Sequence, residues 1–357
     1  MQPVRLYLIP WSHFCDKVRW ALDLKGMPYE KVTYNTTGKT SGLERAPKSM
    51  IKLTPIIEDP NNSNSEKPIF MSDSTPILRY LDENYSNSSP LFPTSDKQAV
   101  IDLCLRLDST LGPYVRRLAY VQIIGEYPRI LCLMQSVKYP WANNPNDIRS
   151  RIIARFVACF VIARFRLHRI REDQVVESTE QVLLDMSARL QNSNYLVGNS
   201  FTAADITFCS LFKPLEILPY FKDDKRFQSL FDYHDRIRKQ HDFRYSENIN
   251  LMEKFIRENR ERLENPTACM KFTAFLNKIN VVKHFCSWMM TGIVSKVYGP
   301  TSDEDQPQEF SSDGKSAAND QRNLNINSKW KIVPFIIKYT CHRLFTIPGQ
   351  YDYLNRR

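Results

Sequence analysis

The order of apolar segments in the first ninety residues constrains the fold more than any other feature of the sequence. Alternating apolar and polar residues predict a strand over 3–9, and helical spacing predicts a helix from Phe14 to Lys25 that stops at Gly26. Three further strands and a second helix are expected, in order, at EKVTY, KLTPIIEDP, PIFMS and SDSTPILRYLDENY. This is a βαβ unit followed by a ββα unit, so the first two strands should be parallel.

Two positions at the ends of these elements have specific expectations. Pro55 begins the third strand beside a loop, where a cis peptide bond would expose the backbone of Thr54, although an ordinary trans proline also fits. The N-cap of the second helix is expected at Ser72 or Asp73, because both side chains can accept a hydrogen bond from the first helical turn.

These motifs resemble the N-terminal domain of the cytosolic glutathione S-transferase family, which has a thioredoxin-like fold. The segment LYLIPWSHFCDKVRWALDLKGMPYEKV looks like the opening of that domain, and Ser12 stands where the serine-type classes carry a catalytic serine. Residues 53–57 resemble the family's cis-proline strand, and Asp73-Ser74 before ILRYL resembles its acid-serine pair. The three elements occur in the family's order and at roughly its spacing.

The resemblance implies that glutathione is the co-substrate and that no metal is required. Ser12 would donate a hydrogen bond to the glutathione sulfur and favour its thiolate. Thr54 would pair with the cysteinyl backbone, while Ser74 and Asp73 would bind the γ-glutamyl carboxylate and amino group; as an alternative, Asp73-Ser74 is a plain N-cap. A lysine, preferably Lys52 over Lys39 or Lys48, would bind the glycyl carboxylate. The implied glutathione contacts are Ser12, Lys52, Thr54, Pro55, Asp73 and Ser74.

Cys15 offers an alternative chemistry. Glutaredoxin-like and omega-like relatives of the family carry a cysteine where Ser12 stands, and some carry CPFC. The motif here reads Ser-His-Phe-Cys, so Cys15 takes the second and more buried position, at the start of the predicted helix. A thiol of lowered pKa there could form a mixed disulfide with glutathione, whereas the plainer interpretation is a packed cysteine. The other seven cysteines show no CxxC pair and no zinc-site spacing, so we interpret them as buried thiols.

Beyond the first domain the sequence is helical. Glycine is scarce, with 10 residues in 357, which argues against a many-turned all-β fold. We therefore expect a thioredoxin-like α/β domain over 1–87, a linker over 88–94 and an all-helical domain over 95–263. Thr202 and Asp205 form a capping-box motif with a structural role. Tyr114 and Arg117 are the candidates for a second-substrate cleft; alternatively the tyrosine is in the core and the arginine is solvated.

The remaining features limit the partners and the compartment. The net charge of +10 selects no partner by itself, and no nucleic-acid-binding motif accompanies it. Seven arginines over 149–171 could meet a membrane surface but are more typical of a solvated face. Residues 264–357 form a C-terminal extension whose polar part, 301–328, should be disordered. We expect no signal peptide, no membrane span, a cytoplasmic location and, from the resemblance, a homodimer.

The predicted function is that of a glutathione transferase, in which Ser12 activates the thiol for attack on a small, apolar electrophile, as in detoxification. The first alternative is a glutathione-dependent thiol-disulfide oxidoreductase that uses Cys15. The second is a non-catalytic interaction protein of the same fold, with the C-terminal extension as the contact surface.

Overall fold

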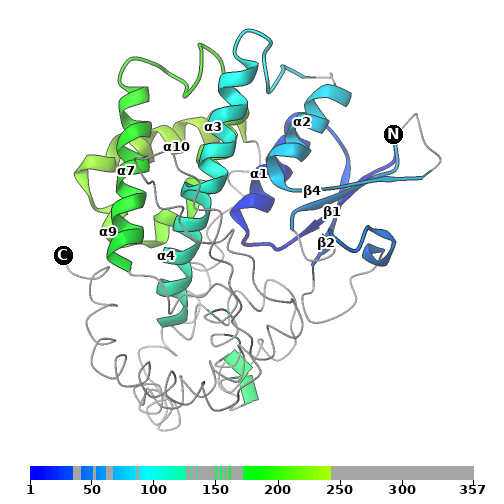
Figure 1. The fold of residues 1–357 in the computed structure, drawn as a ribbon, viewed down its shortest axis with the longest axis horizontal. Coiled ribbons are helices and arrows are strands. Elements are labelled where there is room, and N and C mark those ends of the chain that lie inside the picture. The colour runs from blue at the N-terminus through cyan, green and yellow to red at the C-terminus, as the bar shows by residue number, and fades with distance from the viewer. Residues whose placement is uncertain are drawn as a thin grey trace, which may run out of the picture.

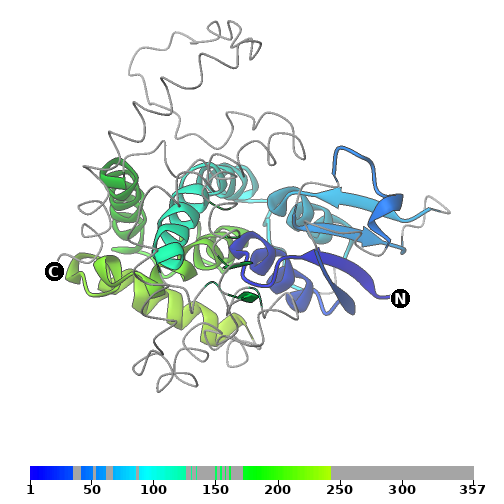
Figure 2. The same cartoon turned by 90° about the horizontal axis from the view of Figure 1, so that it is seen from below.

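The computed structural model describes residues 1–34, 42–50, 54–61, 67–85, 88–125 and 172–242, with a few single residues between 130 and 161. These residues form two parts that lie side by side, a small sheet with two helices and a larger group of helices (Figure 1; Figure 2). Residues 243–263 of the predicted helical domain, the extension over 264–357 and most of the arginine-rich stretch lie outside the described residues. None of the helices in the described ranges is long and apolar enough to cross a membrane.

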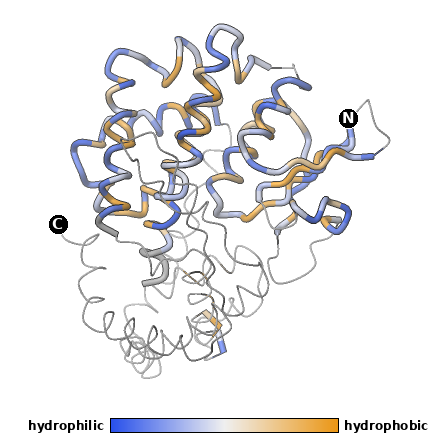
Figure 3. The backbone as a smooth tube through the Cα atoms, viewed as in Figure 1, coloured by the Kyte–Doolittle hydropathy of each residue, from blue (hydrophilic) through white to orange (hydrophobic). Residues whose placement is uncertain are grey.

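The first part is built on four strands in the order β2-β1-β3-β4. β1 (Val4–Leu8) is parallel to β2 (Tyr29–Thr33), while β3 (Ile56–Asp59) is antiparallel to both β1 and β4 (Ile69–Ser72). The βαβ and ββα order and the parallel first pair are therefore confirmed. The two central strands are nearly completely buried, and the sheet contains hydrophobic stretches in Figure 3. Both strands contribute to two hydrophobic clusters, with Leu6 and Ile57 in one and Tyr7 and Ile56 in the other.

Two helices complete this domain. α1 (His13–Leu24) ends before Gly26, which has a φ of 62° and so takes the left-handed conformation of a helix stop, as predicted. α2 (Ser74–Asn84) begins at the N-cap Asp73, so Asp73 rather than Ser72 has that role. A short 3-10 helix, η1 (Leu43–Arg45), lies between β2 and β3. The fold is thus the predicted thioredoxin-like arrangement.

The second part is entirely helical in the described residues. Residues 97–125 form two helices that are separated at Thr110. The capping box of Thr202 and Asp205 is formed at the start of a helix in which all ten residues are buried. The elements of this part are α3 (Lys97–Ser109), α4 (Leu111–Gly125), α7 (Glu172–Leu190), α8 (Ala203–Phe212), η4 (Lys213–Ile217), α9 (Pro219–Lys222), η5 (Lys225–Phe227) and α10 (Gln228–His241).

One hydrophobic core joins the two parts. It runs from Val4 and Leu6 of β1 through Trp20 of α1 to Phe208 of α8 and Ile237 of α10. α1 packs against α2 in its own domain and against α8 in the helical part, so little of its surface remains exposed. This placement holds the N-terminus of α1 between the two parts of the molecule.

Candidate functional site

Ser12 lies at the N-terminus of α1, as predicted, and is half-buried. Its Oγ accepts a hydrogen bond from the Cys15 backbone N–H at 3.4 Å, which makes Ser12 the N-cap. The hydroxyl proton is not used by this contact and can be donated to another group. A sulfur placed beside Ser12 would meet both that proton and the positive end of the helix dipole, and both favour a thiolate.

Cys15, three residues further on, is packed rather than presented. Its side chain is 3% exposed and belongs to the hydrophobic core. Burial raises the pKa of the Cys15 thiol to about 11, although the neighbouring Ser12 opposes the rise. The structure therefore contradicts the idea of a lowered pKa at this thiol, because loss of hydration outweighs the favourable field of the helix N-terminus.

His13 attaches the start of α1 to the helical part. Its Nε2 lies 3.2 Å from the carbonyl oxygen of Gly112 in α4, and a carbonyl partner requires that this nitrogen carry the proton. Burial, with the charge of Arg116 adding to it, lowers the pKa of His13 to about 3, so the ring is neutral at neutral pH. A Cβ at Gly112 would lie 2.4 Å from the Phe14 ring, so the glycine permits this close approach.

Thr54 and Pro55 lie immediately before β3. The Thr54–Pro55 peptide bond is cis, which confirms the expectation for this proline. Pro55 is buried and Thr54 is half-buried, so the Thr54 backbone lies at the start of a central strand of the sheet. Lys52 and Lys39 lie outside the described residues, whereas Lys48 is exposed.

Asp73 and Ser74 form the N-terminus of α2. Asp73 has a φ of 73°, which non-glycine residues rarely adopt, and its Oδ1 accepts a hydrogen bond from the Ser74 N–H at 2.6 Å. Desolvation and the charge of Asp108 raise the pKa of Asp73. Ser74 is fully buried, and its Oγ has no hydrogen-bond partner among the described residues. An unpartnered buried hydroxyl at a helix N-terminus is a group that a bound anion could satisfy.

A buried charge network beside Ser74 was not predicted from the sequence. Lys17 of α1 is completely buried, and its Nζ donates to Thr75 Oγ1 at 2.5 Å and to both carboxylate oxygens of Asp108 at 2.9 Å. Thr75 in turn donates to Asp108 at 2.5 Å. The network joins α1, α2 and α3 behind the Asp73-Ser74 pair. The sequence signal that could have found it is a lysine within the apolar stretch of α1.

Both predicted cleft residues, Tyr114 and Arg117, lie in α4 and are buried, at 8% and 4% exposed. Tyr114 belongs to the hydrophobic core, which agrees with the alternative given for it. The expectation that the arginine is solvated is wrong, because α4 is covered by α3, α7 and α8.

The fold and the site together define a class of protein, in which a thioredoxin-like domain is followed by an α-helical domain. Residues 6–89 match the family model of the glutathione S-transferase N-terminal domain, and residues 168–243 match that of the C-terminal domain. Both described domains therefore match those of the glutathione S-transferase family.

The chain is also similar to individual proteins. It is 30% identical over 116 residues to pyrimidodiazepine synthase of Drosophila melanogaster, a match that spans 32% of this chain and 45% of the synthase. It is 25% identical over 217 residues to a glutathione S-transferase domain-containing protein of Dictyostelium discoideum, spanning 59% of this chain and 67% of that one. A Bombyx mori glutathione transferase structure is 18% identical, with a TM-score of 0.46, over 71% of this chain and 97% of its own.

Proposed function

We propose that the chain is a glutathione transferase in which Ser12 stabilises the glutathione thiolate for attack on a small, apolar electrophile. The observation that carries the proposal is the position of Ser12, an N-cap whose hydroxyl proton remains available, in the same domain as the cis Thr54–Pro55 bond and the unpartnered Ser74 hydroxyl. The match to the N-terminal domain of the family supports glutathione as the ligand.

Ser12 contributes to the chemistry as a hydrogen-bond donor. A free thiol has a pKa of about 8.5 and is mostly protonated at neutral pH, while the thiolate is the nucleophile. Donation from Ser12 lowers the pKa of the bound thiol, and each unit of pKa corresponds to about 1.4 kcal/mol. The thiol proton is released to solvent, and the thiolate attacks the electrophilic carbon: the new carbon–sulfur bond forms as the bond from that carbon to the leaving group breaks, and the leaving group departs with the electron pair.

The remaining groups hold the two ends of the tripeptide. We assign the cysteinyl backbone to Thr54, the γ-glutamyl carboxylate to Ser74 and the γ-glutamyl ammonium to Asp73. The Asp73 carboxylate accepts a hydrogen bond from the Ser74 N–H. To bind the ammonium as well, the same carboxylate must accept hydrogen bonds from both groups. Lys52 remains our candidate for the glycyl carboxylate, and Tyr114 and Arg117 for the second substrate.

The oxidoreductase and the non-catalytic alternatives fit the geometry of the site to different degrees. Thiol-disulfide exchange through Cys15 needs an accessible thiol of low pKa, and burial of this side chain acts against both requirements. The fold by itself is compatible with a non-catalytic role, because one fold can support different functions. A cytoplasmic homodimer is the assembly and location that we propose by analogy with the family.

Calorimetric titration with glutathione, followed by conjugation assays, tests the proposal. We expect binding in the micromolar to low-millimolar range and conjugation that falls at least about tenfold in Ser12→Ala, because about one pKa unit of thiolate stabilisation is lost. Loss of the N-cap also costs Ser12→Ala about 1 kcal/mol of stability. Cys15→Ser should leave conjugation in place.

A second variant separates the two effects of Ser12. Ser12→Asp keeps an N-cap acceptor but donates nothing and repels a thiolate, so it should fold normally and still lose conjugation. Conjugation that survives in Ser12→Asp would refute the role of Ser12. Disulfide exchange that disappears in Cys15→Ser would instead support the oxidoreductase, and absence of glutathione binding would support the non-catalytic protein.

A further inference from the structure

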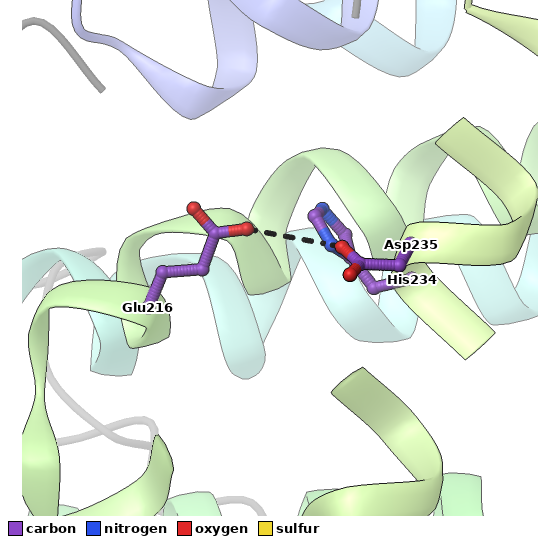
Figure 4. A group of neighbouring side chains, drawn as sticks. All are labelled: Glu216, His234 and Asp235. Carbon is purple, nitrogen blue, oxygen red and sulfur yellow. Dashed lines mark ion pairs between the residues drawn. The ribbon is translucent and has the colours of Figure 1, made fainter. Parts of the chain in front are cut away.

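Three side chains that offer one nitrogen and two oxygens converge in the helical part, outside the glutathione site. Glu216 of η4 extends toward His234 and Asp235, which are neighbours on α10 (Figure 4). His234 Nδ1 lies 3.5 Å from Glu216 Oε1 and 3.5 Å from Asp235 Oδ1. All three potential ligand atoms lie within 4.8 Å of one another.

The histidine is the unusual member of the group. Its side chain is 1% exposed, and neither ring nitrogen has a hydrogen-bond partner within the part of the chain that the structure describes. The ring packs against Phe212, with centroids 5.6 Å apart, which fixes its orientation. A buried imidazole with unpartnered nitrogens is costly unless another group binds it. Its Nδ1 points at two carboxylates that are partly exposed, at 26% and 50%.

From this geometry we propose that Glu216, His234 and Asp235 form a binding site for a divalent transition-metal ion of the Zn²⁺ type. With bonds of about 2.0–2.2 Å, tetrahedral zinc holds neighbouring ligand atoms about 3.3–3.6 Å apart, which matches both nitrogen–oxygen distances. One imidazole and two carboxylates suit zinc better than magnesium, which prefers oxygen ligands only. Water completes the coordination on the exposed side.

Burial also lowers the pKa of His234, although the nearby Asp235 opposes the shift. The ion would clamp η4 onto α10, one turn before Arg238, and so stabilise the helical part of the molecule.

Titration of the chelator-treated full-length chain with ZnCl₂ by calorimetry tests the site. We expect one ion bound here, with affinity reduced roughly tenfold or more in Glu216→Gln and in Asp235→Asn. The matched control is Asp232→Asn, an exposed acid on the same helix that pairs with Gln228 and should not alter affinity. Co²⁺ in place of Zn²⁺ should give the visible absorption bands of a tetrahedral site. Zn²⁺ should raise the melting temperature of the wild type and of Asp232→Asn more than that of Glu216→Gln or Asp235→Asn.

Two outcomes would overturn the proposal. The first is Zn²⁺ binding of equal strength in the wild type, Glu216→Gln and Asp235→Asn, which would assign the ion to other residues of the chain. The second is no Zn²⁺ binding together with a raised pKa of His234 measured by NMR, which would identify an imidazolium held by the two carboxylates. Both variants change partly exposed side chains, so loss of folding is not expected to obscure the result.

Discussion

Ser74 is a residue at which folding and ligand binding favour different side chains. Its hydroxyl is buried without a hydrogen-bond partner among the described residues, a situation that costs about 1–3 kcal/mol. Its neighbour Asp73 adopts a φ of 73°, a conformation that also costs free energy in a non-glycine residue. Two unfavourable features at one helix N-terminus are typical of a binding site, where the ligand compensates for them.

Replacement of Ser74 by alanine should weaken glutathione binding without weakening the fold. The hydroxyl contributes a hydrogen bond to a charged carboxylate in the complex, worth about 1.5–3 kcal/mol, so the affinity should fall about tenfold or more. The free protein loses only an unpartnered group, so its melting temperature should stay the same or rise. Calorimetry with glutathione and a thermal melt of the same variant measure the two effects.

Ser210 supplies the control for this comparison. It is also fully buried with an unpartnered Oγ, but it lies in α8 of the helical part. Ser210→Ala should therefore have a similar effect on stability and leave glutathione affinity unchanged. Equal affinities of wild type and Ser74→Ala would show that Ser74 does not contact the ligand.

Helices and strands were predictable from the sequence where their signals lie within a few residues. α1 shows which of its features could be predicted in this way and which could not. Its N-cap Ser12 and its stop at Gly26 are encoded within a few residues of the helix ends, and both are observed. The helix also buries Asp16 and Lys17, which the apolar stripe does not predict. Asp16 also pairs with Arg19 within the helix, but its buried partner Arg238 is 222 residues away. The partner of Lys17, Asp108, is 91 residues away, so only the packed structure brings these groups together.

The same reasoning applies to the candidate site. Ser12, Pro55 and Asp73 carry local signals, a helix cap or a strand-initial proline, and each is placed as the sequence indicates. The burial of Cys15 depends on helices from the second half of the chain, and local sequence favoured neither of its two interpretations strongly. Burial then decides the protonation state of the thiol, because hydration outweighs the helix dipole.

The contact between α1 and α4 should make stability depend on pH. The pKa of His13 is lowered to about 3 in the folded chain, against 6.5 for an ordinary histidine. Below pH 6.5 His13 binds a proton in the unfolded chain but stays neutral in the folded chain. The free energy of unfolding therefore decreases as the pH falls from about 6.5 toward 3. His13→Gln can still donate to the Gly112 carbonyl but does not titrate. Near about pH 4.5 the acid-induced loss should therefore be about 2–3 kcal/mol smaller in the variant.

Denaturant unfolding at several pH values measures this difference. The other histidines, including the buried His234, are present in both proteins and cancel in the comparison. Parallel stability curves for wild type and His13→Gln below pH 6.5 would mean that His13 is protonated in the folded chain, contrary to its burial.

At the scale of the whole molecule, buried cations connect the two domains: Lys17 pairs with Asp108 of α3, and Arg238 pairs with Asp16 of α1. Arg238 of α10 is 1% exposed; it donates to Asp16 of α1 and, at 2.7 Å, to Asp242, and its guanidinium lies 4.2 Å from the centre of the Trp20 ring. Burial acts to raise the pKa of Asp16, but the charges of Arg238 and Lys213 hold it well below the ordinary range. Because of this contact and the shared hydrophobic core, we expect the two domains to unfold as one unit.

Asp16→Asn should lower the stability of both domains together by about 3 kcal/mol at neutral pH, because it removes one partner of a buried ion pair. The wild type should unfold in a single transition, and the variant should do so at lower denaturant concentration. Its stability should also fall less in acid, since a depressed carboxylate pKa adds stability that is lost as the pH falls through it. Asp185→Asn is the control: it breaks an exposed pair with Arg106, worth at most about 1 kcal/mol. Equal losses in both variants would show that Arg238 does not couple the domains.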